Sequence, residues 1–277
     1  MLRRPSGAVA VALLGTVVVA ALGLSWVPPY DPSAQDLSLT LHPPSLTPVR
    51  GQLHLLGTDK LGRDILSRLL VGLRISLLVG LAVVPLSAAV GLAAGLVTGF
   101  RRGWLDLVLM RIVDTQLAVP TLLLMIAVVA VLGTGLAQIV LVLAVAGWPT
   151  YARVIRAEVL ALAEREFVTA ARAAGAPERR ILLRHVLPNV LPTTLVLATL
   201  QLPVVIIWEA ALSFLGLGIQ PPTPSLGQML GESQEVVWQA WWMPTIPGLA
   251  ITLVVLAFNL IGDRLRDVLD PRLRGQL

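Results

Sequence analysis

The sequence lacks cysteine and contains few charged residues. None of its 277 residues is cysteine, which excludes disulfides, thiolate chemistry and cysteine-based metal sites. Charged residues make up only 13% of the chain, about half the share that is usual in soluble domains. Hydrophobic residues make up 56%, and the mean hydropathy is +0.83. This composition excludes an ordinary soluble domain and indicates a membrane protein.

Lysine is almost absent, although the sequence pI is near 10.9. Lys60 is the only lysine among 21 basic residues, and most of the arginines lie in short runs between long apolar tracts. That distribution is typical of positively charged membrane loops, so it gives no support to nucleic-acid binding.

Motifs of nucleotide-binding and hydrolytic enzymes are also missing. The sequence has no G-x-x-x-x-G-K-[ST] phosphate loop, no G-x-S-x-G nucleophile elbow and no H-E-x-x-H zinc helix. The three histidines, His42, His54 and His185, are too scattered to predict a metal cluster. We therefore expect no catalytic residue, metal or cofactor on this chain, and a membrane enzyme has only weak support.

Long charge-free segments predict six transmembrane helices. A helix needs about 20 apolar residues to cross the hydrocarbon core of a bilayer. The 38-residue run 115–152 is long enough for nearly two crossings and contains a natural break at Gly133-Thr134-Gly135. The expected spans lie near 7–27, 76–99, 106–132, 136–156, 192–215 and 243–262. The predicted fold class is an all-α, polytopic membrane protein whose first span is an uncleaved anchor.

The basic residues predict that both termini are cytoplasmic. In that orientation fifteen basic residues lie on the cytoplasmic side, five lie in the first outer loop, and Arg111 lies inside span three. The expected domains are an anchor helix with an outer loop (1–75), a transmembrane domain (76–265) and a cytoplasmic tail (266–277).

Glycines and prolines inside the spans predict a tightly packed bundle. Gly91, Gly95 and Gly99 share one helical face, which allows close helix approach in lipid. Prolines leave backbone carbonyls that neighbouring helices must satisfy. Five of them stand within or at the edges of spans: Pro85, Pro120, Pro149, Pro203 and Pro247.

The cytoplasmic loop 157–190 predicts a hairpin of two short helices. Residues 166–174 are rich in helix formers, and Gly175 suits the left-handed position that ends a helix. Pro177 is well placed at the start of the second helix. Two further prolines are expected to end that helix: Pro188 and Pro192. The bare alanine surface of the first helix needs a partner, unless the hairpin is only a solvated connector.

This hairpin resembles the coupling loop of inner-membrane permeases of binding-protein-dependent ABC importers. That loop reads E-A-A, three residues, G, nine residues, I-x-L-P. Five residues stand at matching positions: Ala170, Ala171, Gly175, Leu187 and Pro188. Thr169 and His185 depart from the pattern in the manner of the peptide-transport branch, and they argue against a permease of another substrate branch.

The resemblance extends along nearly the whole chain, and it is closest to C-type permeases of dipeptide, oligopeptide and nickel importers. Residues 109–120, 209–222 and 259–271 resemble the third span, the end of the fifth span and the C-terminus of that branch. A motif after span one contributes six further residues: Gly57, Thr58, Asp59, Gly62, Arg63 and Asp64.

The resemblance implies a type I ABC importer bundle in the inner membrane that transports di- or oligopeptides, or glutathione or nickel. A homologous B-type permease, two cytoplasmic ATPases that hold ATP and Mg²⁺, and an external substrate-binding protein would complete the importer. The residues implied to contact the ATPase are Glu166, Thr169, Ala170, Ala171, Arg172, Gly175, Ala176, Leu187 and Pro188.

An ion-coupled secondary carrier is the alternative from another class of transporter. It would use charged residues inside the membrane, and Asp106 is one candidate. Arg111, Asp114 and Glu209 are further candidates, and they are equally candidates for the path of an importer. Because a lone charge in lipid is costly, we expect Arg111 and Asp114 to pair with each other or with a partner permease.

Overall fold

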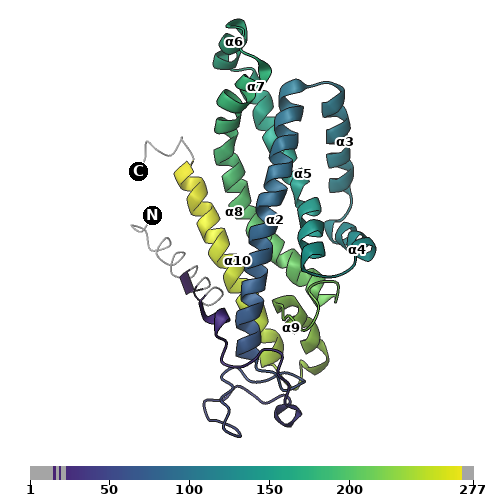
Figure 1. Cartoon of the computed structure of the whole chain (residues 1–277), viewed down its shortest axis with the longest axis vertical. Coiled ribbons are helices and arrows are strands. Elements are labelled where there is room, and N and C mark those ends of the chain that lie inside the picture. The colour runs from purple at the N-terminus through teal and green to yellow at the C-terminus, as the bar shows by residue number, and fades with distance from the viewer. Residues whose placement is uncertain (1–14, 17–18, 20–22, 270–277) are drawn as a thin grey trace.

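Four long helices run along the length of the molecule (Figure 1). The computed structural model describes residues 15–16, 19 and 23–269, and the expected span at 7–27 lies mostly outside them. The long helices are α2 (Ile65–Arg101), α5 (Leu136–Ala163), α8 (Leu187–Phe214) and α10 (Trp242–Leu269). Each is long and apolar enough to cross a membrane.

Shorter helices connect the long ones, and no β-strand occurs in the part of the chain that the structure describes. They are α3 (Trp104–Ala118), α4 (Thr121–Leu132), α6 (Glu166–Ala173), α7 (Glu178–Ile181) and α9 (Leu226–Ser233). Single turns lie at Leu24–Trp26, Leu37–Leu39 and Gln234–Val236. The sequence did not predict α9. The expected domain boundary at 75 falls inside α2, which begins at Ile65.

The glycine face of α2 packs directly on α5, as predicted. A Cβ atom at Gly91 would lie 2.4 Å from the Cβ of Tyr151, and one at Gly99 would lie 2.7 Å from the Cβ of Val159. A Cβ at Gly95 is excluded in the same way. Only glycine allows the two backbones to approach this closely.

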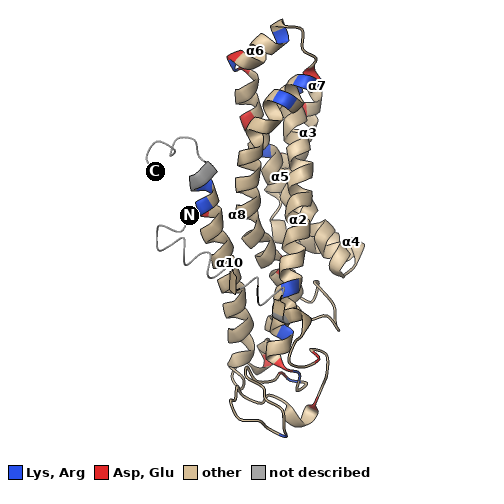
Figure 2. Ribbon diagram, turned by 60° about the vertical axis from the view of Figure 1, so that its left-hand side comes forward, with Lys and Arg blue, Asp and Glu red and all other residues tan. Residues whose placement is uncertain are grey.

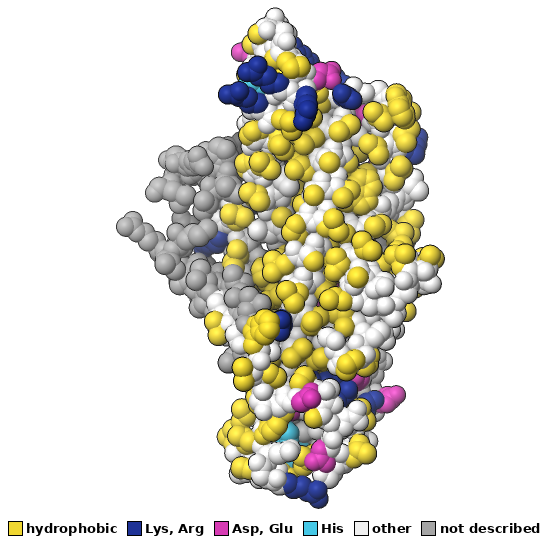
Figure 3. Space-filling view, viewed as in Figure 1, with side chains coloured by type: hydrophobic (Ala, Val, Ile, Leu, Met, Phe, Trp, Pro, Cys, Tyr) yellow, Lys and Arg dark blue, Asp and Glu magenta, His cyan; other side chains and the backbone are white. Residues whose placement is uncertain are grey.

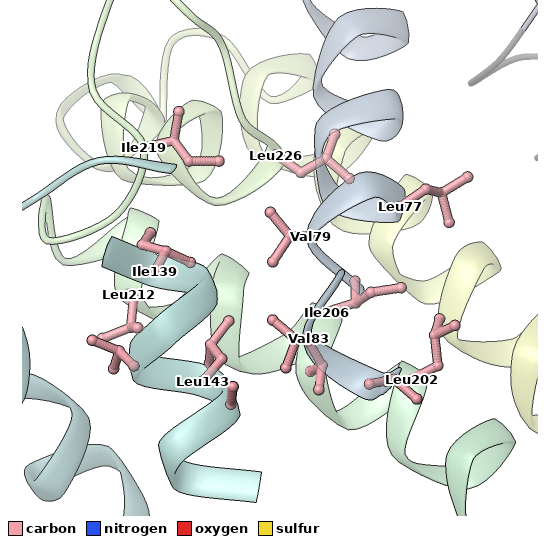
Figure 4. Close-up of a cluster of buried hydrophobic side chains, with 14 of the residues drawn as sticks. Leu77, Val79, Val83, Ile139, Leu143, Leu202, Ile206, Leu212, Ile219 and Leu226 are labelled. Atoms are coloured by element: carbon pink, nitrogen blue, oxygen red, sulfur yellow. The ribbon is translucent and has the colours of Figure 1, made fainter. Parts of the chain in front are cut away.

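A hydrophobic core lies where α2, α5 and α8 meet the segment that leads into α9 (Figure 4). Interdigitated aliphatic side chains from these elements fill it, and in lipid such van der Waals packing holds helices together. Its labelled members are Leu77, Val79, Val83, Ile139, Leu143, Leu202, Ile206, Leu212, Ile219 and Leu226.

The span predicted near 106–132 is not one straight helix. Residues 104–132 form two helices, α3 and α4, that meet at an angle of 100°. Val119 is extended and Pro120 follows it, because a proline disfavours the helical conformation of the residue before it. Among the described residues there are therefore four spans, or five if the bent pair counts as one.

The prediction that Pro188 and Pro192 end a helix was wrong. The chain passes from α7 through a π-helical turn (Leu182–Val186) directly into α8. In that turn the Leu187 N–H bonds to the Leu182 carbonyl, five residues back. Local π-helical adjustments of this kind let membrane helices accommodate proline, so Pro188 stands in the first turn of α8 without ending the helix.

Charged residues gather toward the two ends of the bundle and at the C-terminal end of α10 (Figure 2). One end carries the α6–α7 hairpin, and the opposite end carries the loop before α2 together with α9 (Figure 1). Between them, hydrophobic side chains cover most of the face shown in Figure 3. This is the surface that a membrane-spanning bundle presents to lipid.

Candidate functional site

The α6–α7 hairpin is closed by a Schellman motif around Gly175. The Ala176 N–H bonds to the Ala171 carbonyl at 3.1 Å, and the Gly175 N–H bonds to the Arg172 carbonyl at 2.9 Å. Gly175 has a φ of +77°, the left-handed conformation that this motif requires. A Cβ at Gly175 would meet no atom within 4 Å. The predicted role of Gly175 as a helix-ending residue is confirmed, and it rests on backbone conformation rather than on crowding.

Two buried side chains fasten the hairpin to the bundle. Val168 of α6 and Ile181 of α7 are fully buried. They belong to a cluster that includes Phe100 at the end of α2 and Ile155 and Val159 on α5. The hairpin is therefore joined to the same α2–α5 pair that the glycine face holds together.

The outer surface of the hairpin is shallow, small and basic. Ala170 is exposed, Ala171 is half-buried, and Glu166, Thr169 and Arg172 are exposed beside them. A surface hollow of about 520 Å³ runs along the turn. Its walls include Ala171, Ala174, Gly175, Ala176, Arg180 and Arg184. This surface could receive an apolar ridge that is flanked by acidic groups.

Leu187 and Pro188 lie apart from that hollow. They begin α8, where Leu187 is half-buried and Pro188 is exposed. His185 precedes them in the π-helical turn, and its ring lies 6.5 Å from that of Phe167 on α6. The structure therefore brings the first seven predicted residues together on the hairpin and places the last two at its junction with the membrane helix.

The predicted pair of Arg111 and Asp114 does not form within this chain. Asp114 instead accepts a hydrogen bond from Arg153 of α5 at 2.6 Å. Next along the two helices, Arg156 holds both carboxylate oxygens of Asp106, at 2.5 and 2.7 Å. Arg111 makes no ion pair with any residue of the described chain. The arginines of α5, close to α3 only in the folded bundle, were not found by reasoning from the sequence.

Glu209 lies inside the bundle rather than on a surface. It is fully buried in α8 and accepts hydrogen bonds from Ser76 of α2 and Ser213 of α8, both at 2.8 Å. The two hydroxyl groups compensate part of the cost of burying this carboxyl group. In the described state Glu209 joins α2 to α8.

The motif at 57–64 folds back on itself at the other end of the bundle. Gly57 and Gly62 have positive φ angles, and a Cβ at either would collide with backbone atoms of the preceding loop. Asp64 caps the N-terminus of α2 by accepting from the Ser67 N–H at 2.7 Å. His54 bonds to the same carboxylate through Nδ1 at 2.8 Å.

Asp59 organises a group of two buried and two half-buried charged residues that we call the clasp: Asp59, Arg68, Arg63 and Glu232. Arg63 Nε lies 2.7 Å from Asp59, and Arg68 contacts the same carboxylate. Both arginines also bond to Glu232 of α9, at 2.8 and 2.7 Å. The clasp thus fixes the loop and α2 to α9, and the motif is structural in this state.

A second contact ties the motif to the last long helix. The indole Nε1 of Trp242, in the first turn of α10, donates to the Thr58 carbonyl at 3.2 Å. At the surface nearby, Lys60 bonds to Glu235 at 2.7 Å. That hydrogen bond and the ammonium charge lower the pKa of the Glu235 carboxyl group.

Known proteins share this sequence over almost its full length. The di/tripeptide permease DppC of Pseudomonas aeruginosa is 47% identical over 94% of this chain and 86% of its own. The dipeptide permease DppC of Haemophilus influenzae is 42% identical over 95% of this chain and 91% of its own. The glutathione permease GsiD of Escherichia coli is 44% identical over 94% of this chain and 84% of its own.

The fold is also found among solved structures. A chain of the MetNI methionine ABC transporter, in an inward-facing conformation, superposes with a TM-score of 0.60 at 22% identity. The alignment covers 73% of this chain and 96% of that one. Residues 91–275 match the family of binding-protein-dependent transport system inner membrane components. Together with the relatives above, this match shows that the chain is a multi-pass membrane permease and belongs to that family.

Proposed function

We propose that this chain is one of two permease subunits of an ATP-driven importer for small peptides in the inner membrane. The relatives that align with nearly the whole chain are named for di/tripeptide, dipeptide and glutathione transport. Glutathione is itself a tripeptide, so these names describe one substrate class. A homologous B-type permease and an external binding protein complete the path.

The ATP-binding machinery belongs to two separate ATPase subunits in this proposal. Both termini and the hairpin lie on the cytoplasmic side, six helices span the membrane, and ATP and Mg²⁺ bind only to the ATPases. The observation that carries the proposal is the hairpin surface. It is a rigid turn of small residues, fastened to α2 and α5 by Val168 and Ile181 and open to another protein.

Charge favours an acidic partner for this surface. Arg172 is exposed on α6, and Arg179, Arg180 and Arg184 are exposed along α7 and the turn that follows. A groove that receives the hairpin therefore needs acidic side chains at its rim, because unlike charges across an interface guide docking. The hydrolysis of ATP would then move α2 and α5 through the hairpin.

The first experiment separates this proposal from an ion-coupled carrier. We would reconstitute both permeases and the ATPases in vesicles and measure uptake of a labelled dipeptide that the binding protein delivers. Uptake should require ATP and both ATPases, and an ion gradient should not replace them. Gradient-driven uptake by the permeases alone would overturn the proposal.

The α3–α5 face that carries Arg111, Asp114 and Arg153 lines the path in this proposal. Tyr151, two residues before Arg153, packs against Gly91 of α2. At about 1.5 Å per residue, Gly91 lies about 15 Å along α2 from Arg101. Arg153 therefore lies on the side of the bundle and not at its tip, yet Arg153 and Asp114 are 55% and 58% exposed. A charge that faces lipid costs up to about 2.5–3.5 kcal/mol. The face must therefore meet water or protein.

Cysteine labelling tests this placement cleanly because the chain has no cysteine of its own. Thr115 is exposed on α3 beside Arg111 and Asp114, whereas Leu256 is exposed on α10 among apolar residues. In the assembled importer Thr115→Cys should react with a water-soluble thiol reagent, and Leu256→Cys should not. Equal protection of both cysteines would show that the charged face is dry and does not line the path.

A further inference from the structure

A cavity of about 170 Å³ lies between α2, α5, α8 and the bend from α3 to α4. Each of its walls contains a proline next to a lining residue. Pro85 adjoins the lining residue Val84, Pro120 adjoins Thr121, and Pro149 adjoins Thr150. In the fourth wall, formed by α8, Pro203 adjoins the lining residue Val204. We call this cavity the proline-layer pocket.

A proline in a helical wall exposes a backbone carbonyl that can accept a hydrogen bond. Each proline inside a helix leaves the carbonyl four residues earlier without its helical donor. At Pro149 that carbonyl belongs to Val145, and the side-chain amide of Gln116 donates to it at 2.5 Å. At the same level of α5, Ser87 of α2 donates to the Ala144 carbonyl at 3.3 Å. The Gln116 side chain thus satisfies the carbonyl that Pro149 leaves without a helical donor.

The hydroxyl group of Tyr151 is the exception. Tyr151 is only 1% exposed, and its oxygen has no hydrogen-bond partner among the described residues. A buried hydroxyl without a partner is costly, so such groups are normally satisfied by an occupant of the adjoining space. That space is the pocket, which Tyr151 lines.

The rest of the lining defines what the pocket accepts. Hydroxyl, amide and indole groups alternate with aliphatic side chains, and no charged residue lines it. The polar members are Ser87, Thr121, Thr150, Tyr151, Gln201 and Trp208. Without a counter-charge a charged group would enter only at high cost, whereas a neutral group can exchange hydrogen bonds with the walls.

We propose that the proline-layer pocket binds the uncharged polar side chain of a peptide during translocation, with the Tyr151 hydroxyl as one of its hydrogen-bond partners. This inference rests on the proposed function. The volume equals roughly six water molecules at about 30 Å³ each, which is enough for one such side chain. Leu117 and Val204 of the lining are 39% and 40% exposed, so the pocket reaches the surface of the chain.

The test is a competition between two dipeptides in vesicles that contain the complete importer. Gly-Gln carries an uncharged polar side chain and Gly-Gly carries none, and different isotopes report their uptake together. The same binding protein serves every variant, so its selectivity cancels between wild type and variant. Tyr151→Phe removes only the hydroxyl group, and Ala146→Leu fills the pocket. Ala137→Leu makes the same change at an exposed position of α5 outside the lining.

Tyr151→Phe and Ala146→Leu should each lower the Gly-Gln to Gly-Gly uptake ratio about fivefold, the size expected for one hydrogen bond. Gly-Gly uptake itself should stay within about twofold of wild type, and Ala137→Leu should leave the ratio unchanged. An unchanged ratio in either pocket variant would overturn the inference and leave a cavity that holds only water. If the wild-type importer took up neither dipeptide, the proposed function would fail first, and the inference with it.

Discussion

The two ends of the bundle hold their charges in opposite ways. At the end with the loop and α9, Asp59 and Arg68 are 1% and 2% exposed, and the clasp satisfies their charges within the chain. At the hairpin end two ion pairs lie at the surface: Arg101 with Glu178, whose side chains are 63% and 64% exposed, and Arg102 with Glu164, at 54% and 72%. Exposed pairs of this kind contribute little to stability.

This difference distinguishes the end with the clasp, whose charges are paired within the chain, from the hairpin end, whose surface is open to a partner protein. The clasp fixes the loop, α2, α9 and, through Trp242, α10 in one arrangement. The hairpin has two buried anchors and an open surface of small residues. Helix α2 runs between the two ends, so movement of the hairpin reaches the clasp through one continuous element.

Damage to the open surface of the hairpin should give the largest loss of function with the smallest loss of structure. Ala171→Glu places a long charged side chain in the hollow beside Gly175. We expect peptide uptake to fall at least about tenfold, because the ATPase can no longer approach the hairpin, while the yield of the permease stays normal. Uptake and co-purification of the ATPases are the measurements.

Glu178→Gln is the matched control for that surface. It removes one exposed charge on α7 and its 3.4 Å contact with Arg101. Uptake and ATPase binding should stay close to wild type. If Ala171→Glu behaved like this control, the hairpin would be a connector and the contrast between the two ends would lose its functional meaning.

Damage to the clasp should mainly lower the stability of the complex. Arg68→Met leaves the carboxylates of Asp59 and Glu232 with one arginine instead of two. Removing one partner of a buried ion pair typically costs about 3–5 kcal/mol, so the thermal midpoint of the purified complex should fall by several degrees. Lys60→Gln, which breaks the exposed pair with Glu235, should leave the midpoint unchanged. Equal midpoints for the two variants would refute a structural role for the clasp.

Local patterns in the sequence predicted much of the hairpin and of the helix contacts. Gly175 ends α6 through bonds that span only six residues, and the glycine face of α2 follows from the spacing of a single helix. The bend at Pro120 was within reach, because a proline restricts its predecessor. Prolines 85, 149 and 203 lie inside continuous helices, so proline alone does not identify a break.

Contacts between distant segments were beyond such patterns. Arg68 and Glu232 are 164 residues apart, and Asp114 and Arg153 are 39 apart. Helix packing decides which carboxylate each arginine pairs with. The sequence alone offers several carboxylates for each arginine and does not show which one lies within reach. The pocket is of the same kind, because its walls come from four segments that only the fold brings together.

A change in the middle of α2 tests whether the two ends are joined mechanically. Gly91→Ala adds a Cβ that would lie 2.4 Å from Tyr151 and 2.6 Å from the Trp148 carbonyl, so α2 and α5 must separate. Such overpacking typically costs about 1–3 kcal/mol. ATP hydrolysis should persist while uptake per ATP falls. Gly248→Ala on α10, where the nearest atom is 3.9 Å away, is the control and should leave both unchanged. Unaltered coupling in Gly91→Ala would mean that the hairpin moves independently of the bundle.

Single cysteine substitutions at exposed positions are the smallest change, and they determine on which side of the membrane each end of the bundle lies. Trp238 is 97% exposed next to α10 and Ser38 is exposed in the loop, whereas Ser225 is buried as the cap of α9 and would be a poor probe. Ser38→Cys and Trp238→Cys should react with an impermeant thiol reagent in intact cells. Arg179→Cys on the hairpin should react only after the cells are opened. Ser38→Cys and Trp238→Cys should not change uptake appreciably, because neither residue lies in the clasp or in the hollow. Labelling of Arg179→Cys from outside would invert the orientation, and the open end could then no longer be the end that meets the ATPases.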